Sequence, residues 1–241
     1  MANKDILQKD DSYYLLSRPE MALFLPKSIK SMRVLEIGCG AGNFGAHFEC
    51  AELWGIEPNE NMAKHARLII NKVLLGNYDE VSDLLPDHYF DLVVCNDVIE
   101  HMNDIECFFN SIKQKMKRDG LLLGSIPNIR FIENLIRLLV FRDWKYTAWG
   151  ILDKTHLRFF TAKSLKRLFI ENQFQIIKFS GINPVVLKFH SLKSFCINLA
   201  LIVCTFIFGR DTQYFQFGFL IKHQPPEIDP SLAKNSMNSP A

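Results

Sequence analysis

The sequence predicts an α/β fold, a three-layer sandwich with helices on both faces of a mostly parallel sheet. Short apolar segments that fit β-strands alternate with segments whose apolar residues recur at helical spacing. The apolar run at residues 90–95 suits a strand that is covered on both faces. The 241 residues are 48% hydrophobic, which allows one large domain with a sizeable core.

The expected elements follow one another along the chain. Strands are expected at residues 34–37, 53–56, 72–75, 90–95, 121–125, 174–179 and 213–221. Helices are expected to begin within 43–48, to follow Asn59 and Thr161 as N-caps, and to cover 105–116 and 131–141. This alternation is typical of βαβ units.

The main domain is expected to span residues 31–223, after a helical lead-in at 1–30. Within it, 128–160 is expected to cover an acceptor site, and 185–210 forms an apolar insertion. Residues 224–241 are rich in Pro, Ser and Asn, which predicts a disordered tail.

Composition excludes some classes of protein. The net charge of +2 argues against the basic footprint of a nucleic-acid-binding domain. The N-terminus lacks the apolar stretch of a secretory signal, and the six cysteines show no metal-ligand spacing. We therefore expect a cytoplasmic protein with reduced thiols and no metal cluster.

Three glycines, Gly38, Gly40 and Gly42, follow the first expected strand. Glycine lets the backbone turn tightly and lets a ligand approach the main chain. Glu57 ends the second strand 20 residues after Ile37, where an acidic residue of nucleotide-binding folds accepts hydrogen bonds from ribose hydroxyls. The spacing predicts a nucleotide site at the carboxyl ends of these two strands.

Two classes of protein use this geometry. The dinucleotide pattern G-x-G-x-x-G occurs as Gly40, Gly42 and Gly45, but the register that starts at the first glycine of the loop has Asn43 at its third position. The methyltransferase pattern acid-x-G-x-G-x-G is matched at every defined position of residues 36–42.

On these residues the chain resembles the class I S-adenosylmethionine-dependent methyltransferase family. The likeness continues in family order through residues 55–58, 90–101 and 117–123. The segment 153–161 resembles subfamilies that act on quinone precursors and on bacterial surface-polysaccharide sugars. The resemblance implies a Rossmann-like fold with one antiparallel strand near the C-terminus, and S-adenosylmethionine as the cofactor.

The resemblance also implies which residues bind the cofactor: Glu36, Gly38, Gly40, Gly42, Glu57, Asn77, Tyr78 and Asn96. One segment departs from the family pattern, because residues 76–79 read Gly-Asn-Tyr-Asp where an acid often follows the third strand. The partner of the adenine ring therefore stays open among Asn77, Tyr78 and Asp79.

Candidate catalytic residues follow the fourth strand and occur again beyond residue 150. Methyl transfer to a hydroxyl requires removal of its proton, for which histidine is the usual residue. His101 and His156 are the two candidates for the base, and Asp97 is expected to orient a ring or the acceptor. Either histidine could instead satisfy a backbone group in a structural turn.

Basic and aromatic residues are interleaved over residues 128–167. Arg158, Trp149 and Tyr146 are candidate acceptor-binding residues, since aromatic faces stack on rings and arginine binds phosphate or carboxylate. They predict an acceptor that is anionic, such as a nucleotide sugar or a lipid-linked glycan. A solvated basic face is the alternative, and for Arg158 an ion pair with Asp153.

Residues 195–208 are almost entirely apolar and too short to span a bilayer. A buried helix or an oligomer contact is one interpretation. A helix lying on anionic lipid is the other, with peripheral attachment to the inner face of the membrane.

The sequence thus predicts a methyltransferase that acts on an oxygen, on a surface-polysaccharide sugar or a related small molecule. One alternative is a nicotinamide-dependent oxidoreductase or epimerase, although no Tyr-x-x-x-Lys pair occurs. The other is a non-catalytic cofactor-binding module that regulates a partner.

Overall fold

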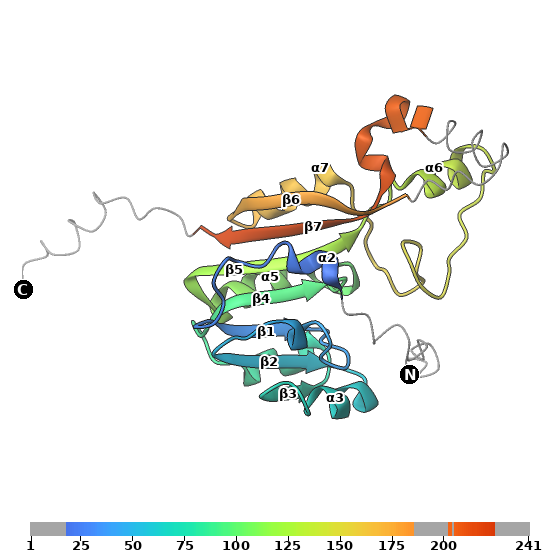
Figure 1. The fold of residues 1–241 in the computed structure, drawn as a ribbon. Helices are drawn as coiled ribbons and strands as arrows, with labels where there is room; N and C mark the ends of the chain where they lie inside the picture. The colour runs from blue at the N-terminus through green and yellow to red at the C-terminus, as the bar shows by residue number, and fades with distance from the viewer. Residues whose placement is uncertain (1–17, 186–201, 204, 225–241) are drawn as a thin grey trace, which may run out of the picture.

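The computed structural model describes residues 18–185, 202–203 and 205–224. Seven strands form one sheet: β1 (Arg33–Ile37), β2 (Glu52–Glu57), β3 (Lys72–Leu75), β4 (Phe90–Asn96), β5 (Met116–Pro127), β6 (Phe174–Pro184) and β7 (Tyr214–His223). Their order is β3-β2-β1-β4-β5-β7-β6 (Figure 1). The first five strands are parallel, and β7 is antiparallel to both β5 and β6. The expected fold, including its one antiparallel strand, is confirmed.

Helix α2 (Pro19–Ala22) precedes β1. The other helices lie between strands of the sheet: α3 (Glu60–Ala66), α4 (Tyr78–Val81), α5 (Ile105–Lys115), α6 (Ile132–Leu139) and α7 (Ala162–Glu171). Short 3-10 turns are η2 (Gly45–His47), η3 (Ser82–Leu84), η4 (Ile99–His101) and η5 (Arg210–Gln213). Both predicted N-caps are confirmed, because the side chains of Asn59 and Thr161 accept hydrogen bonds from the first turns of α3 and α7.

The core lies on both faces of the sheet, since successive residues of a strand point to opposite sides. On one face Leu35 and Val93 pack with buried residues of α5 and α7. On the other face Val34, Leu92 and Val94 pack with residues of α2 and α3. Strand β4 is therefore covered on both sides, as its apolar run predicts.

The helix expected to begin within 43–48 is wrong in extent, because only the single turn η2 forms there. Gly45 explains the difference: a Cβ at this residue would lie 2.5 Å from Cδ2 of Leu53 in β2. The segment passes directly against the neighbouring strand and reaches extended backbone at Phe48. One turn between such constraints is too short to propagate a helix.

The apolar insertion lies partly outside the described residues. Its described end, 202–203 and 205–208, is helical and exposes Ile202, Val203, Phe206 and Ile207. In the part of the chain that the structure describes, every helix is too short or too polar to cross a bilayer. The predicted lead-in before residue 18 and the tail beyond residue 224 also lie outside the described residues.

Candidate functional site

The loop after β1 carries the three glycines of the sequence pattern. All have a positive φ, with 69° at Gly38, 54° at Gly40 and 87° at Gly42, which residues with a side chain rarely adopt. At Gly38 an added Cβ would also lie 3.0 Å from Cγ2 of Val98. Backbone conformation and available space both require glycine there.

The carboxylate of Glu57, the last residue of β2, holds this loop in place. One oxygen accepts a 2.8 Å hydrogen bond from the N–H of Gly40, and the other accepts one from the N–H of Asn59 at the same distance. Burial raises the pKa of Glu57, although these two hydrogen bonds oppose the shift. Because β1 and β2 are parallel neighbours, the acid and the loop share one edge of the sheet.

Glu36, the penultimate residue of β1, is a second buried acid at this edge. Burial raises the pKa of its carboxyl to about 8; the nearby charge of Glu57 adds to this shift and a backbone hydrogen bond from Gly45 opposes it. Its Oε2 atom has no hydrogen-bond partner among the described residues. This oxygen lies near Gly45, where an added Cβ would be 3.2 Å from it. Since buried polar atoms are normally paired, Glu36 is a candidate for contact with a ligand.

A cavity of about 550 Å³ opens at the carboxyl ends of the parallel strands, where open α/β sheets bind their ligands. Seven of the predicted cofactor residues line it: Glu36, Gly38, Gly40, Glu57, Asn77, Tyr78 and Asn96. Gly42 is not among the residues that line this cavity. Gly42 packs instead against α3, where an added Cβ would lie 3.4 Å from Cα of Ala66.

The lining of this cavity includes the segment that departs from the family pattern. Asn77, Tyr78 and Asp79 all line the cavity. The hydroxyl of Tyr78 lies 2.8 Å from Oγ of Ser111, so its polar group is engaged within the protein. Both polar atoms of the Asn96 side chain are buried without a partner among the described residues, which makes this amide a second group available to a ligand.

A second cavity of about 410 Å³ adjoins the first, and Arg18 and Asp97 line both. Its other lining residues are Pro19, Glu20, Pro127, Trp149, Gly150, Asp153, His156, Asn183, Phe215 and Gln216. Rings of Pro, Trp and Phe dominate its apolar part. The second cavity therefore lies beside the first and has proline and aromatic rings in its wall.

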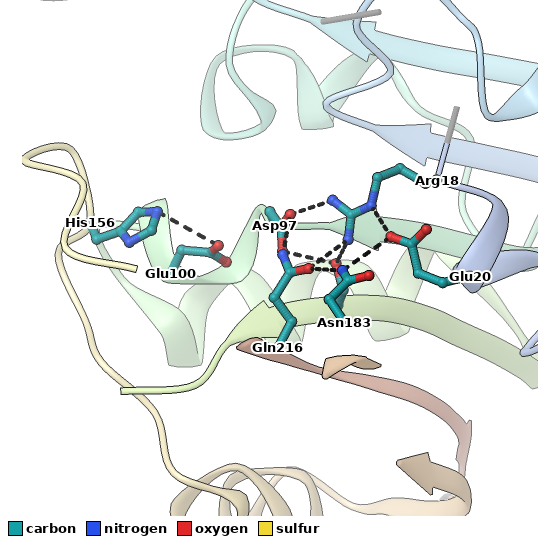
Figure 2. Close-up of polar contacts among 8 residues, drawn as sticks. Arg18, Glu20, Asp97, Glu100, His156, Asn183 and Gln216 are labelled. Atoms are coloured by element: carbon teal, nitrogen blue, oxygen red, sulfur yellow. Dashed lines mark hydrogen bonds and ion pairs between the residues drawn. The ribbon is translucent and has the colours of Figure 1, made fainter. Parts of the chain in front are cut away.

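Arg18 joins the N-terminal segment to the ends of β4, β5 and β7 (Figure 2). Its guanidinium donates hydrogen bonds to Asp97, to Oγ of Ser125 at 2.8 Å and to Glu20 at 2.8 Å. Gln216 donates to both carboxylate oxygens of Asp97 at 2.7 Å. Burial alone would raise the pKa of Asp97, but Arg18 and these hydrogen bonds more than compensate and hold it below its usual value.

Sequence reasoning missed Arg18 and Gln216. They lie 79 and 119 positions from Asp97 along the chain, so no local spacing connects them. The contacts also show what Asp97 does in the described residues: it binds Arg18, while its predicted role in orienting the acceptor stays a prediction.

The two predicted histidines come together at the boundary of the cavities. Their rings meet edge to face with centroids 4.7 Å apart; His101 lines the first cavity and His156 the second. Nδ1 of His101 lies 3.1 Å from the carbonyl oxygen of Thr155, and Nδ1 of His156 lies 3.0 Å from that of Ile151. Nε2 of His156 faces Oε1 of the buried Glu100 at 3.8 Å (Figure 2).

The three predicted acceptor-binding residues do not lie together in one cavity. Trp149 is 71% exposed and lines the second cavity. Tyr146 and Arg158 lie outside the lining of both cavities. The guanidinium of Arg158 donates to the backbone carbonyls of Met102 and Asn103, and its expected contact with an anionic acceptor stays a prediction.

Comparison with known proteins defines the class. A family model described as a methyltransferase domain matches residues 8–178, so the chain belongs to this family of class I S-adenosylmethionine-dependent methyltransferases. It is 30% identical over 134 residues to a ubiquinone biosynthesis O-methyltransferase of Rhodopseudomonas palustris (strain BisB5), a match that covers 54% of this chain and 48% of that protein. The chain thus spans about half the length of this relative.

Solved structures agree on the fold. An S-adenosylmethionine-dependent methyltransferase from Archaeoglobus fulgidus is similar with a TM-score of 0.56 at 22% identity, over 80% of this chain and 86% of that one. One from Mesorhizobium loti is similar with a TM-score of 0.58 at 16% identity, over 85% and 96%.

The residues of the first cavity fit S-adenosylmethionine, the cofactor of this family. The fixed carboxylate of Glu57 suits the ribose hydroxyls. The unsatisfied Oε2 of Glu36 and the unsatisfied amide of Asn96 suit the polar, positively charged end of the cofactor. The cavity volume lies within the range of about 300–1,000 Å³ that small-molecule sites occupy.

Proposed function

We propose that this protein methylates a hydroxyl oxygen of a small molecule that binds in the second cavity. The observation that carries the proposal is the shared wall: Arg18 and Asp97 line both cavities, and the touching rings of His101 and His156 belong to one cavity each. S-adenosylmethionine supplies a methyl group on a positively charged sulfur, which is a very good leaving group. The protein's own task is then to position the hydroxyl and to remove its proton.

Activation of the hydroxyl falls to the two histidines in this proposal. Asp97 is engaged with Arg18, Ser125 and Gln216 and has a lowered pKa, so it is a weak base. Both histidines have Nδ1 beside a carbonyl oxygen, which only accepts a hydrogen bond. Each Nδ1 therefore carries the proton, and each Nε2 keeps a lone pair.

The first candidate acceptor is a phenolic ring, as in a quinone precursor. The relative from Rhodopseudomonas palustris is named for O-methylation in ubiquinone biosynthesis. The rings of Trp149, Phe215 and Pro127 in the second cavity support a flat acceptor.

The second candidate acceptor is a sugar hydroxyl of a surface-polysaccharide precursor. The exposed indole of Trp149 in the cavity lining supports it, because aromatic faces also stack on sugar rings. A nicotinamide-dependent reaction and a purely regulatory role have no comparable support.

A lipid-linked acceptor would bring the protein to a membrane surface. Exposed apolar residues support this part of the proposal: Leu138 and Leu139 of α6, and Phe206 and Ile207 of the described end of the insertion. Co-sedimentation with vesicles that contain anionic lipid tests it. Retention in the supernatant with such vesicles would contradict it.

Methyl transfer is tested with the full chain, S-adenosylmethionine and two acceptor panels, prenylated dihydroxybenzoates and nucleotide sugars, with mass spectrometry of the products. We expect a methyl ether from one panel. His156→Ala is expected to lower kcat about 10²–10⁴-fold while S-adenosylhomocysteine still binds. His65→Ala, a change at an exposed histidine of α3, is the matched control. Methylation of nitrogen, or full activity of His156→Ala, would contradict the proposal.

A further inference from the structure

One wall of the second cavity is built around the guanidinium of Arg18 (Figure 2). This group forms an ion pair with Glu20 at 2.8 Å and a second one with Asp97. Its Nη2 atom donates a hydrogen bond to Oγ of Ser125 at 2.8 Å. All three guanidinium nitrogens therefore donate within the protein, and one positive charge lies between two carboxylates.

The side-chain amides beside Arg18 also direct their N–H groups toward this wall. Nε2 of Gln216 donates to both carboxylate oxygens of Asp97 at 2.7 Å. Nδ2 of Asn183 donates to Oε1 of Gln216 at 2.8 Å and lies 3.5 Å from Oε1 of Glu20. The amide donors of the wall thus bind the oxygen atoms of the wall itself.

Two oxygen atoms of the wall are left over. Oε2 of Glu20 and Oδ1 of Asn183 accept no hydrogen bond from the residues that the structure describes. Both residues line the cavity, and the side chain of Glu20 is 23% exposed. Carboxylate and amide oxygens only accept hydrogen bonds, so they favour a ligand that offers an N–H or O–H group.

We propose that Glu20 and Asn183 are specificity-determining residues: they accept hydrogen bonds from a hydroxyl or ammonium group of the acceptor and select against a carboxylate or phosphate there. The inference rests on the proposed function, because that function assigns the second cavity to the acceptor. It differs from the anionic acceptor that the basic residues within 128–167 suggest.

The other charged groups of the second cavity support this selectivity. The lining contains a third carboxyl group, that of Asp153, which is 1% exposed. The imidazole of His156 faces the carboxylate of Glu100 at 3.8 Å, so an acid of the protein already lies beside this ring. Acidic groups outnumber basic ones around the cavity, and an anionic ligand would be repelled because charges interact strongly where water is partly excluded.

The arginines of the neighbouring segments bind elsewhere. Arg130 forms an ion pair with Asp211 at 2.8 Å, and Arg158 donates to backbone carbonyls. Neither lines the second cavity. Among the described residues, Arg18 is the one arginine or lysine in this lining, and its charge is shared by Glu20 and Asp97.

Three catechols that differ in one substituent test the proposal: dihydroxybenzyl alcohol is uncharged, dihydroxybenzylamine is a cation and dihydroxybenzoate is an anion. Their dissociation constants are measured by calorimetry with the full chain and saturating S-adenosylhomocysteine. We expect the alcohol and the amine to bind about tenfold or more tightly than the benzoate. For the same reason, the uncharged counterparts of prenylated dihydroxybenzoates and of nucleotide sugars should be methylated faster than those anions.

Two substitutions should change this selectivity in opposite directions. Glu20→Gln removes one negative charge at nearly constant size, and the ratio of the benzoate to the amine dissociation constant should fall about threefold or more. Asn183→Asp adds a carboxylate and should raise the ratio, since aspartate tolerates the φ of 51° at this position. Glu49→Gln, at a side chain that is 82% exposed, is the control and should leave the ratio unchanged. A general loss of structure would not produce opposite changes.

The proposal is overturned if the benzoate binds as tightly as the amine, if the alcohol and the amine show no measurable binding, or if Glu20→Gln leaves the ratio unchanged. Product analysis with S-adenosylmethionine separates this result from the proposed function. Methyl ethers formed from the benzoate and the alcohol with equal kcat/KM would leave the proposed function standing and contradict the selectivity. Binding in the expected order without methylation of any hydroxyl would contradict the proposed function and leave the selectivity of the cavity standing.

Discussion

Two buried acids of the cofactor cavity illustrate how similar residues take different roles. Glu57 has both oxygens engaged by backbone N–H groups, and it shapes the glycine loop. Glu36 keeps Oε2 unsatisfied among the described residues, and burial raises its pKa to about 8. The first acid therefore has a structural role, whereas burying the second destabilises the unliganded fold.

Glu36 should make the stability of the unliganded protein fall as pH rises. Its folded-state pKa of about 8 lies above its value of about 4.5 in the unfolded chain. The folded state thus binds the extra proton between these values, and stability decreases from about pH 5 to pH 9, by a few kcal/mol. Thermal unfolding of Glu36→Gln should show a flatter decline over this range.

Glu49→Gln is the control for this measurement, because the side chain of Glu49 is 82% exposed. It should leave the pH dependence as in the unmodified protein. An equally steep decline in Glu36→Gln would show that Glu36 titrates normally and that its burial has little effect.

At the residue scale, the sequence pattern predicted those site residues that lie close to one another along the chain. The acid two positions before Gly38 and the acid at the end of the second strand follow directly from spacing, and both line the cavity. Glu100 follows the fourth strand, yet its partner His156 lies 56 positions away. That contact depends on the path of residues 141–160 across the cavities, which no periodicity encodes.

At the scale of elements, Arg18 connects the segment that begins with α2 to the carboxyl ends of β4 and β5 through its hydrogen bonds to Asp97 and Ser125. Its side chain and that of Asp97 are only 14% and 12% exposed. Removing one member of such a pair leaves a buried charge without compensation.

Arg18→Ala should therefore destabilise the protein by about 3 kcal/mol, measured by urea unfolding, and should weaken S-adenosylhomocysteine binding because Arg18 lines its cavity. Asp97→Asn added to Arg18→Ala should restore part of the stability, since the uncompensated charge is then gone. Additive losses in the double variant would refute this coupling.

Arg158 connects the segment after α6 to the loop between η4 and α5. It donates to the carbonyls of Met102 and Asn103, and these two residues line the cofactor cavity. Arg158→Ala should weaken S-adenosylhomocysteine binding several-fold in calorimetry and leave the KM of the acceptor unchanged.

The reverse result for Arg158→Ala, a raised acceptor KM with unchanged S-adenosylhomocysteine affinity, would support the anion-binding role that the sequence suggested. Lys154→Ala is a suitable control, since Lys154 is an exposed cation of the same segment.

Elements with a clear apolar period or cap were predicted close to their observed bounds, as for α5, α7 and β4. The turn η2 was predicted as a longer helix. Its length is limited by the contact of Gly45 with Leu53 on the next strand, which is a tertiary constraint and has no local signature.

At the scale of the whole molecule, parallel strands bring their carboxyl ends to one edge, and both cavities open there. The segments that complete the second cavity come from distant parts of the chain: Arg18 before β1, Trp149 and His156 after α6, and Gln216 in β7. The residues of the first cavity at the ends of β1 and β2 could therefore be predicted from the sequence. The lining of the second cavity depends on the strand order near β7, which only the family resemblance helped to predict.

Calorimetric titration with S-adenosylhomocysteine, beside NAD and NADP, tests the central claim most directly. The account predicts micromolar-range binding of S-adenosylhomocysteine alone. Glu57→Ala should weaken it strongly, because the change removes both the ribose partner and the hydrogen bond to Gly40. Binding of a nicotinamide dinucleotide, or equal affinity of Glu57→Ala for S-adenosylhomocysteine, would contradict the account.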